Sequence, residues 1–235
     1  ILLNGDTPRL IDEWQDAPML WDAVRTTVDD RQIPGQFILT GSNAVDKSQI
    51  HHSGAGRITR LRMLPMSLWE SKESTGEVSL KELFNNPDYD IDGKMSKMSI
   101  EDLIFAASRG GWPASLLART PKAQLLVAKN YVQTICLDDI SGIDGKRRDA
   151  KLTSMILRAY ARNVSTLVKK KSLIDDVISS GEVSCHTDTF DDYVSALEKL
   201  FVIQNVSAWC PAIRSKTAIR SSVKRCFCDP SIPIA

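Results

Sequence analysis

Two short apolar segments near the start of the chain each end in side chains that could do chemistry. The first ends in two adjacent carboxylates, Asp12 and Glu13, and the second ends in two hydroxyls, Thr40 and Ser42. In an ATPase, one carboxylate of such a pair holds Mg²⁺ and the next polarises the attacking water. These residue types therefore predict a nucleotide site in which Asp12 and Glu13 are catalytic and Asp12 faces the metal ion.

The spacing of the two segments predicts how they are positioned. Apolar runs of this length, separated by a helix-sized segment, are typical of buried parallel strands in an α/β sheet. In such sheets the ligand chemistry lies at the carboxyl ends of the strands, where both polar pairs stand. Residues 58–63 alternate apolar and basic side chains, which predicts a half-exposed strand. Between the first two strands, residues 18–30 carry apolar side chains at helical spacing: Leu20, Trp21, Val24 and Val28.

The loop that usually cradles nucleotide phosphates is missing from the sequence. No G-x-x-x-x-G-K-[ST] pattern occurs, because Gly93-Lys94 and Gly145-Lys146 lack both the earlier glycine and a following Ser or Thr. That loop usually precedes the Asp-Glu strand, which here begins almost at residue one of a chain that starts with Ile. We therefore expect a piece of a longer protein, inactive as an ATPase by itself. ATP and Mg²⁺ are expected cofactors of the intact parent, with none bound to this chain.

Composition and charge bound the class of protein. The 235 residues are 43% apolar and 25% charged, as in ordinary soluble domains, and no apolar run is long enough to span a membrane. The net charge of +1 argues neither for nor against a nucleic-acid partner. Five cysteines without scaffold spacing indicate reduced thiols and a cytoplasmic protein. Cys210, Cys226 and Cys228 have no fourth ligand nearby, so zinc is not expected.

Two further regions follow the α/β region of residues 1–70. Residues 71–148 read as a helical lid or linker, with a helix after Ser99 and a break at residues 110–113, where Trp112 is expected to pack rather than to stack on bases. Residues 149–235 contain three predicted helices and then short predicted strands, an order typical of a winged helix-turn-helix. These helices are 152–164, 172–178 and 187–200, and these strands are 201–203, 206–209 and 223–228. The predicted fold class is α/β plus α.

The charged residues in the last region support two different functions. Basic side chains between the final predicted strands could contact DNA phosphates as a wing. They are Arg214, Lys216, Arg220, Lys224 and Arg225. The short basic runs 146–148 and 169–171 strengthen this interpretation. The third helix weakens it, because its acidic residues repel phosphates. They are Asp188, Asp191, Asp192 and Glu198. DNA binding and protein contact or dimerisation both stay open.

Several motifs together resemble a known family. Residues 10–15, 37–42 and 53–70, followed by 110–113, 138–141 and 224–231, are similar in type and order to the bacterial and archaeal AAA+-type P-loop ATPases that carry a DUF4143 C-terminal region. The resemblance implies a partial parallel-sheet AAA+-type core with a helical lid-like segment and a winged helix. The Walker A loop of the family is absent. The nuclease-like segment that usually follows is absent too, so no nuclease residue is assigned.

The resemblance also implies roles for individual residues. Asp12 corresponds to the Walker B carboxylate associated with Mg²⁺, and Glu13 to the base that orients water. Thr40 or Ser42 stands where a sensor-1 residue contacts the γ-phosphate. Arg57 matches a Gly-Arg position and is either a charge-sensing or finger arginine or a surface arginine in a turn.

Three functions remain as hypotheses from the sequence. The first is a fragment of an ATPase that remodels a nucleic-acid or protein complex. The second is a DNA-binding regulator with a relic ATPase half. The third is an interaction protein whose acidic third helix faces a partner, or which forms a homo-oligomer.

Overall fold

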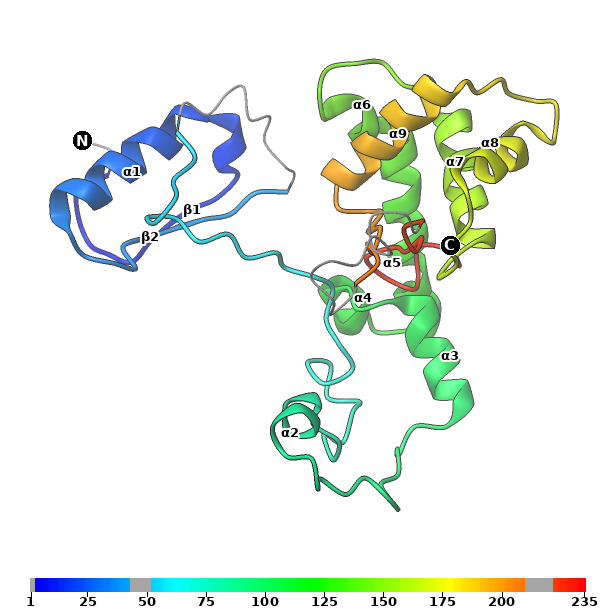
Figure 1. Ribbon diagram of the computed structural model, residues 1–235, viewed down its shortest axis with the longest axis horizontal. Helices are drawn as coiled ribbons and strands as arrows, with labels where there is room; N and C mark the ends of the chain where they lie inside the picture. The colour runs from blue at the N-terminus through cyan, green and yellow to red at the C-terminus, as the bar shows by residue number, and fades with distance from the viewer. Residues whose placement is uncertain (1–2, 43–51, 210–221) are drawn as a thin grey trace. The chain divides into compact units, whose positions relative to one another are not determined.

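The apolar runs near residues 10 and 38 form two parallel strands, as predicted. In the computed structural model, which describes residues 3–42, 52–209 and 222–235, β1 (Arg9–Ile11) pairs with β2 (Phe37–Leu39) in parallel, with Leu10 opposite Ile38. Helix α1 (Met19–Arg31) joins them, close to the predicted 18–30. These elements belong to a compact unit, Ile1–Met63, and the remainder, Leu64–Ala235, forms a second unit (Figure 1).

The strands of the first unit are covered on one face only, so the prediction that they are buried was wrong. Leu10 is 63% exposed and Ile38 is 53% exposed, while the strand residues on either side of each are half-buried. The only helix longer than one turn in the described part of this unit is α1, which buries Trp21 and Val24. A single helix can shield one side of a sheet, whereas parallel strands are usually buried on both sides.

Residues 58–63 do not form the predicted strand. Their backbone has no regular secondary structure, and Leu61 and Met63 are almost fully exposed. Alternation of side chains marks a strand only where a neighbouring strand supplies hydrogen-bond partners. Instead, the guanidinium of Arg60 lies 5.1 Å from the ring centre of Trp21, so this segment packs through its side chains.

The second unit is helical in its described residues. Its helices are α2 (Leu80–Asn85), α3 (Ile100–Arg109), α4 (Pro113–Leu117), α5 (Pro121–Thr134), α6 (Ile140–Gly142), α7 (Ala150–Arg162), α8 (Lys170–Ile178) and α9 (Thr187–Lys199), with a π-helical turn, η3 (Ile135–Asp139), between α5 and α6. Ser99 caps α3 as predicted, because its hydroxyl accepts from the amide of Asp102 while Asp102 accepts from the amide of Ser99.

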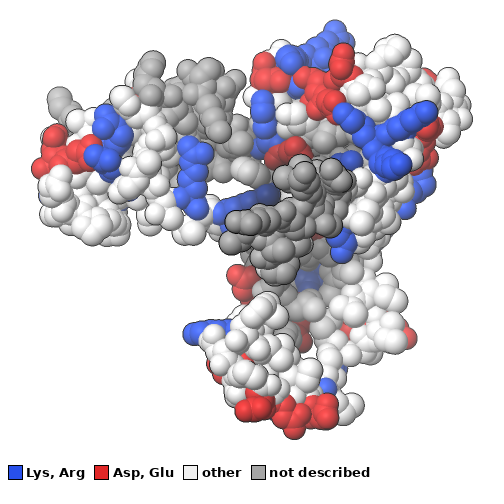
Figure 2. Space-filling view, viewed as in Figure 1, with Lys and Arg blue, Asp and Glu red and all other residues white. Residues whose placement is uncertain are grey.

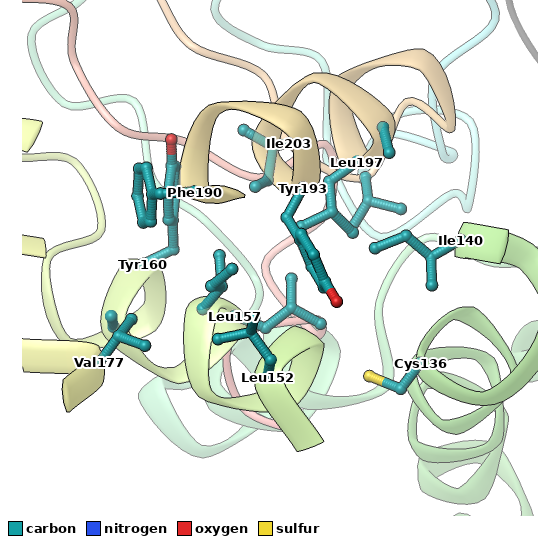
Figure 3. Close-up of a cluster of buried hydrophobic side chains, with 14 of the residues drawn as sticks. Cys136, Ile140, Leu152, Leu157, Tyr160, Val177, Phe190, Tyr193, Leu197 and Ile203 are labelled. Atoms are coloured by element: carbon teal, nitrogen blue, oxygen red, sulfur yellow. The ribbon is translucent and has the colours of Figure 1, made fainter. Parts of the chain in front are cut away.

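Among the described residues, the later helices of the second unit pack around a hydrophobic core. Side chains from η3, α6, α7, α8 and α9 converge on it, and Figure 3 shows Tyr160 beside Phe190, with Tyr193, Leu197 and Ile140 further along. The rings of Tyr160 and Phe190 stack with centres 6.4 Å apart. Residues from both sides of position 148 belong to this core, so residues 71–148 and 149–235 share it.

After α9 the chain returns as two paired segments rather than as the extended strands that were predicted. Antiparallel bridges join Ile203 to Phe227 and Val206 to Lys224, with hydrogen bonds of 2.8 to 2.9 Å between the Val206 and Lys224 backbones. Residues 210–221, which include Arg214, Lys216 and Arg220 of the predicted wing, lie outside the described residues. None of the helices in the described parts of the chain is long and apolar enough to cross a membrane.

Candidate nucleotide site

Backbone pairing continues past the two strands and brings their polar ends together. The amide of Thr40 donates to the carbonyl of Ile11 at 2.9 Å, and the amide of Trp14 donates to the carbonyl of Thr40 at 3.1 Å. This pairing holds Asp12 and Glu13 beside the residues that follow β2. The juxtaposition expected from parallel strands is therefore present.

Each hydroxyl residue after β2 binds one carboxylate after β1. The Thr40 hydroxyl donates to Oδ1 of Asp12. The Ser42 hydroxyl donates to Oε2 of Glu13 at 3.0 Å, and the Ser42 amide approaches the same oxygen at 3.4 Å. Asp12, Glu13 and Ser42 are exposed and Thr40 is half-buried. The cluster is thus a set of oxygen ligands that are oriented by one another and open to solvent.

Gln15 is a member of this cluster that the sequence did not single out. Its side-chain amide donates to Oε2 of Glu13 and, at 3.3 Å, to the hydroxyl of Ser42. Gln15 reaches them because the chain turns sharply after β1 into a short 3-10 turn, η1 (Trp14–Asp16). The only feature of the sequence that could have identified Gln15 as a site residue is its position two residues after Glu13.

Glu13 has an unusual backbone conformation for a residue other than glycine. Its φ of 49° and ψ of 44° lie in the left-handed region. Such a conformation costs on the order of 1–3 kcal/mol and persists where the surroundings enforce it, often at functional sites. Here the hydrogen bonds of Ser42 and Gln15 hold the side chain while the pairing of Trp14 with Thr40 holds the backbone.

The side chain of Arg57 contacts residues other than Asp12 and Glu13. Its Nε donates to Oδ1 of Asp29 at 2.8 Å, near the end of α1, and Nη1 donates to the carbonyl of Ala55 at 3.3 Å. The hydrogen bond from Arg57 lowers the pKa of the Asp29 carboxyl below its ordinary value. The structure therefore gathers four of the five predicted nucleotide-site residues and pairs the fifth with α1.

The described candidates for nucleic-acid contact differ in exposure. Lys224 is exposed, whereas Arg225 is half-buried and turned toward the core. Nη1 of Arg225 lies 3.4 Å from both the hydroxyl of Tyr160 and Oδ1 of Asn205, and its guanidinium lies 5.8 Å from the Tyr160 ring centre. Arg225 thus closes the C-terminal segment onto α7.

Basic residues that the sequence suggested as DNA contacts are bound to the acidic helix α9. Lys146 and Arg148 both bind Asp192, at 2.8 and 2.9 Å, and Lys170 binds Asp191 at 2.8 Å. Arg148 also donates to both carboxylate oxygens of Asp144 at 2.8 Å, and its hydrogen bonds lower the pKa of that carboxyl to about 2. These cations neutralise acidic residues of the same unit, and Figure 2 shows blue Lys and Arg groups next to red Asp and Glu groups.

A second cluster closes the turn between α3 and α4. Oδ2 of Asp229 accepts from the amide of Gly111 at 2.9 Å, and the hydroxyl of Ser231 accepts from the indole nitrogen of Trp112 at 2.9 Å. The Trp112 ring lies 4.6 Å from that of Tyr131, which confirms the prediction that Trp112 packs. Within residues 3–42, 52–209 and 222–235, no three His, Cys, Asp or Glu side chains are grouped so that they could hold a metal ion.

Comparisons with known proteins divide the chain into two parts. An AAA domain matches residues 2–72, the region that contains the carboxylate and hydroxyl cluster. A domain of unknown function, DUF8612, matches residues 100–235, in place of the DUF4143 region that the motifs resembled. No curated protein and no solved structure matches the chain. The DUF8612 match covers more than half of the sequence, so the chain belongs to the DUF8612 family and carries an AAA-type ATPase-like region before it.

Proposed function

We propose that residues 1–63 supply the water-orienting and magnesium-facing half of an ATP site. The observation that carries this proposal is the paired cluster at the carboxyl ends of β1 and β2, in which Thr40 binds Asp12 and Ser42 binds Glu13. The match of residues 2–72 to an AAA domain supports the same assignment. Arg57 is left out of the proposed site because its guanidinium pairs with Asp29.

The residues present fit a magnesium–nucleotide complex by type. Mg²⁺ prefers oxygen ligands and is usually held by one or two carboxylates together with nucleotide phosphates. Bound Mg²⁺ would neutralise charge that develops on the phosphates. Asp12 would face the metal ion, with Thr40 fixing the direction of its carboxylate. Glu13 would accept a hydrogen bond from the attacking water, while Ser42 and Gln15 hold its carboxylate in place.

Turnover is not expected from this chain by itself. No phosphate-cradling G-x-x-x-x-G-K-[ST] pattern occurs in the 235 residues, so the positive donors for the β- and γ-phosphates are missing from the sequence. The cluster can contribute to binding of a metal–nucleotide complex. The sequence lacks the lysine that usually stabilises the negative charge on the phosphates in the transition state. The AAA-like region therefore acts as part of an ATPase site.

Relaxation by a paramagnetic metal tests the site without requiring turnover. With Mn²⁺-ATP we expect broadening of the backbone amide signals of residues 12–15 and 40–42, since Mn²⁺ prefers the same ligands as Mg²⁺. Asp12→Asn should weaken binding at least about tenfold, because it removes the charge that faces the metal ion. Asp16→Asn, an exposed carboxylate in the adjoining turn η1, is the matched control and should leave the broadening unchanged. Broadening centred elsewhere, or equal effects of both variants, would contradict the assignment.

A second candidate function concerns residues 149–235. Three helices followed by two antiparallel paired segments support the proposal of a winged-helix-like module. Its third helix, α9, exposes Asp188 and Glu198, while its Asp191 is paired with Lys170. The carboxylates of Asp188 and Glu198 would repel a DNA backbone, so we infer that the module contacts a protein rather than a duplex.

Salt-dependent binding to a short DNA duplex distinguishes these alternatives. For the full chain we expect no specific binding and a nearly flat dependence of affinity on salt, because phosphate contacts would otherwise give a slope of about −0.9 per contact. A steep slope that is lost in the triple variant Arg214→Ala, Lys216→Ala, Arg220→Ala would overturn this expectation. The triple variant Lys81→Ala, Lys94→Ala, Lys97→Ala, which removes as much charge from another segment, is the control.

A further inference from the structure

The glycine at position 41 is explained by space and not by backbone conformation. The φ angle of Gly41 lies outside the left-handed region, so its backbone does not require glycine. A Cβ built at this position would overlap Oε1 of Gln15 and lie 3.3 Å from Cδ of the same side chain. The third neighbour, Cδ1 of Trp14, would be at an ordinary contact distance of 3.5 Å. The missing side chain therefore makes room for the Gln15 carboxamide.

Only one end of the Gln15 carboxamide is hydrogen-bonded in this position. Its Nε2 donates to Oε2 of Glu13 and, at 3.3 Å, to the hydroxyl of Ser42. Its Oε1 is buried and has no hydrogen-bond partner among the residues that the structure describes. A buried acceptor without a donor is unfavourable, and in a native protein it calls for a reason such as a catalytic role. Here the group that gains from the placement of Gln15 is the Glu13 carboxylate.

The hydrogen bonds to Glu13 all reach one of its two carboxylate oxygens. Oε2 accepts from Nε2 of Gln15 and from the hydroxyl and the amide of Ser42, the last two at 3.0 and 3.4 Å. No hydrogen bond from the described part of the chain reaches Oε1 of Glu13. Donors on one oxygen fix the direction of the carboxylate, while the other oxygen keeps its capacity to accept from a ligand.

We infer that Gly41 and Gln15 are positioning residues that hold Oε2 of Glu13 and leave its Oε1 for the water of a bound metal–nucleotide complex. This role rests on the function proposed above and adds to it which oxygen of Glu13 accepts from the water and why position 41 is glycine. Gly41 acts through Gln15, and Gln15 acts through Glu13. A larger residue at position 41 would move the carboxamide off Glu13 and leave Ser42 as the remaining described donor.

Substitution of Gly41 should disturb the site without unfolding the first unit. The atoms that an alanine side chain would overlap or crowd belong to the end of the flexible Gln15 side chain and not to the backbone. Rotation of Gln15 about its side-chain bonds relieves the overlap, and the pairing of β1 with β2 does not involve this side chain. Gly41→Ala therefore reports on the position of Gln15 rather than on the stability of the sheet.

The NMR signals of the Gln15 carboxamide in the full chain report its position before any ligand is added. In the parent chain we expect both protons to be shifted from the values of a solvated glutamine and to exchange slowly with water, since Nε2 donates to two acceptors. Gly41→Ala should return both signals to the solvated values. The carboxamide of Gln32, which donates to the carbonyl of Asp29 at 2.6 Å, is the internal control and should not change. A Gln15 signal that is the same in the parent and in Gly41→Ala would overturn the role of Gly41.

A double-mutant cycle with Mn²⁺-ATP tests the role of both residues toward the ligand. From the concentration dependence of the broadening, Gln15→Ala and Gly41→Ala should each weaken binding about tenfold, the lower end of the range for residues that orient groups at a metal site. The double variant should bind no more weakly than either single variant, because both substitutions remove the same contact.

The outcomes of this cycle separate the two claims. Losses that multiply to about 100-fold in the double variant would mean that Gly41 does not act through Gln15. Single variants that bind as tightly as the parent would overturn the positioning role altogether. A parent chain that bound no Mn²⁺-ATP would contradict the proposed function and the role toward water, whereas the carboxamide signals would still show whether Gly41 makes room for Gln15.

Discussion

Replacing Arg148 with methionine is expected to lower the free energy of unfolding by about 3 kcal/mol, the size of effect seen when one partner of a buried ion pair is removed. The Arg148 side chain is 2% exposed and donates to Asp144, Asp192 and the carbonyl of Ile140. Methionine keeps much of the length but none of the donors. Both carboxylates can still reach water, so the loss should fall at the lower end of the range for buried pairs. Urea denaturation followed by circular dichroism measures it.

Lys146→Met is the matched control for this substitution. Lys146 binds the same Asp192 at 2.8 Å, but its side chain is 64% exposed. Exposed ion pairs are screened by solvent and contribute little to stability, so this variant should unfold at nearly the same urea concentration as the parent chain. Similar losses from both substitutions would mean that Arg148 acts only through surface charge and not as a buried connection between α6, α9 and the loop before α7.

Gly111→Ala is the second substitution with a large expected effect, about 3 kcal/mol, at the upper end for overpacked sites. An added Cβ would lie 2.7 Å from the Met66 amide nitrogen and 3.0 Å from its carbonyl carbon, both backbone atoms. Gly111 cannot move away easily, because its carbonyl accepts from Met66 at 2.7 Å and its amide donates to Asp229 at 2.9 Å. Urea titration of the purified variant measures the loss.

Gly142→Ala provides the comparison for the same chemical change. No heavy atom lies within 4 Å of a Cβ built at Gly142, at the end of α6. This variant should match the parent or gain up to about 1 kcal/mol, since alanine favours helix more than glycine does. If both alanine variants unfolded at the same urea concentration, the close approach of Met66 to Gly111 would not be a constraint on the fold.

The candidate nucleotide cluster was predictable because its geometry follows from local rules. Two apolar runs flanking a helix-length segment give parallel neighbours, and parallel neighbours bring their carboxyl ends to one edge. Asp12 with Thr40 and Glu13 with Ser42 follow directly from that topology. Gln15 did not, because its reach to Glu13 depends on the left-handed turn at Glu13, and nothing in residue type signals that turn.

Which acidic residue each Lys or Arg would pair with was the least predictable feature of the second unit. The runs at residues 146–148 and 169–171 have the composition of phosphate-binding loops, and α9 has the composition of a repulsive surface. Tertiary structure brings them together, so that Lys170 meets Asp191 across 21 positions of sequence and Arg148 meets Asp192 across 44. A charge count along the chain cannot separate cations that face solvent from cations that already have a carboxylate partner.

Burial of the two strands was mispredicted for a related reason. Leu10 and Ile38 look like core residues by type, and a parallel strand normally has cover on both faces. What covers a sheet depends on which other elements reach it, and α1 reaches only one side in the described part of the first unit. The alternation of apolar and basic side chains at residues 58–63 led to a wrong prediction for a similar reason, because a strand requires a neighbouring strand for its backbone hydrogen bonds.

The hydrogen bond from the Gly111 amide to Asp229 constrains the order in which the chain folds during synthesis. The two residues are separated by 118 positions, so α3 and α4 leave the ribosome long before the carboxylate that fixes the turn between them. Contacts this distant in sequence form late and slow the completion of folding. Until Asp229 and Ser231 emerge, a nascent chain carries Trp112 without its hydrogen-bond partner and Gly111 with an unpaired amide. In a nascent chain this turn therefore stays open until residues 229–231 have been made.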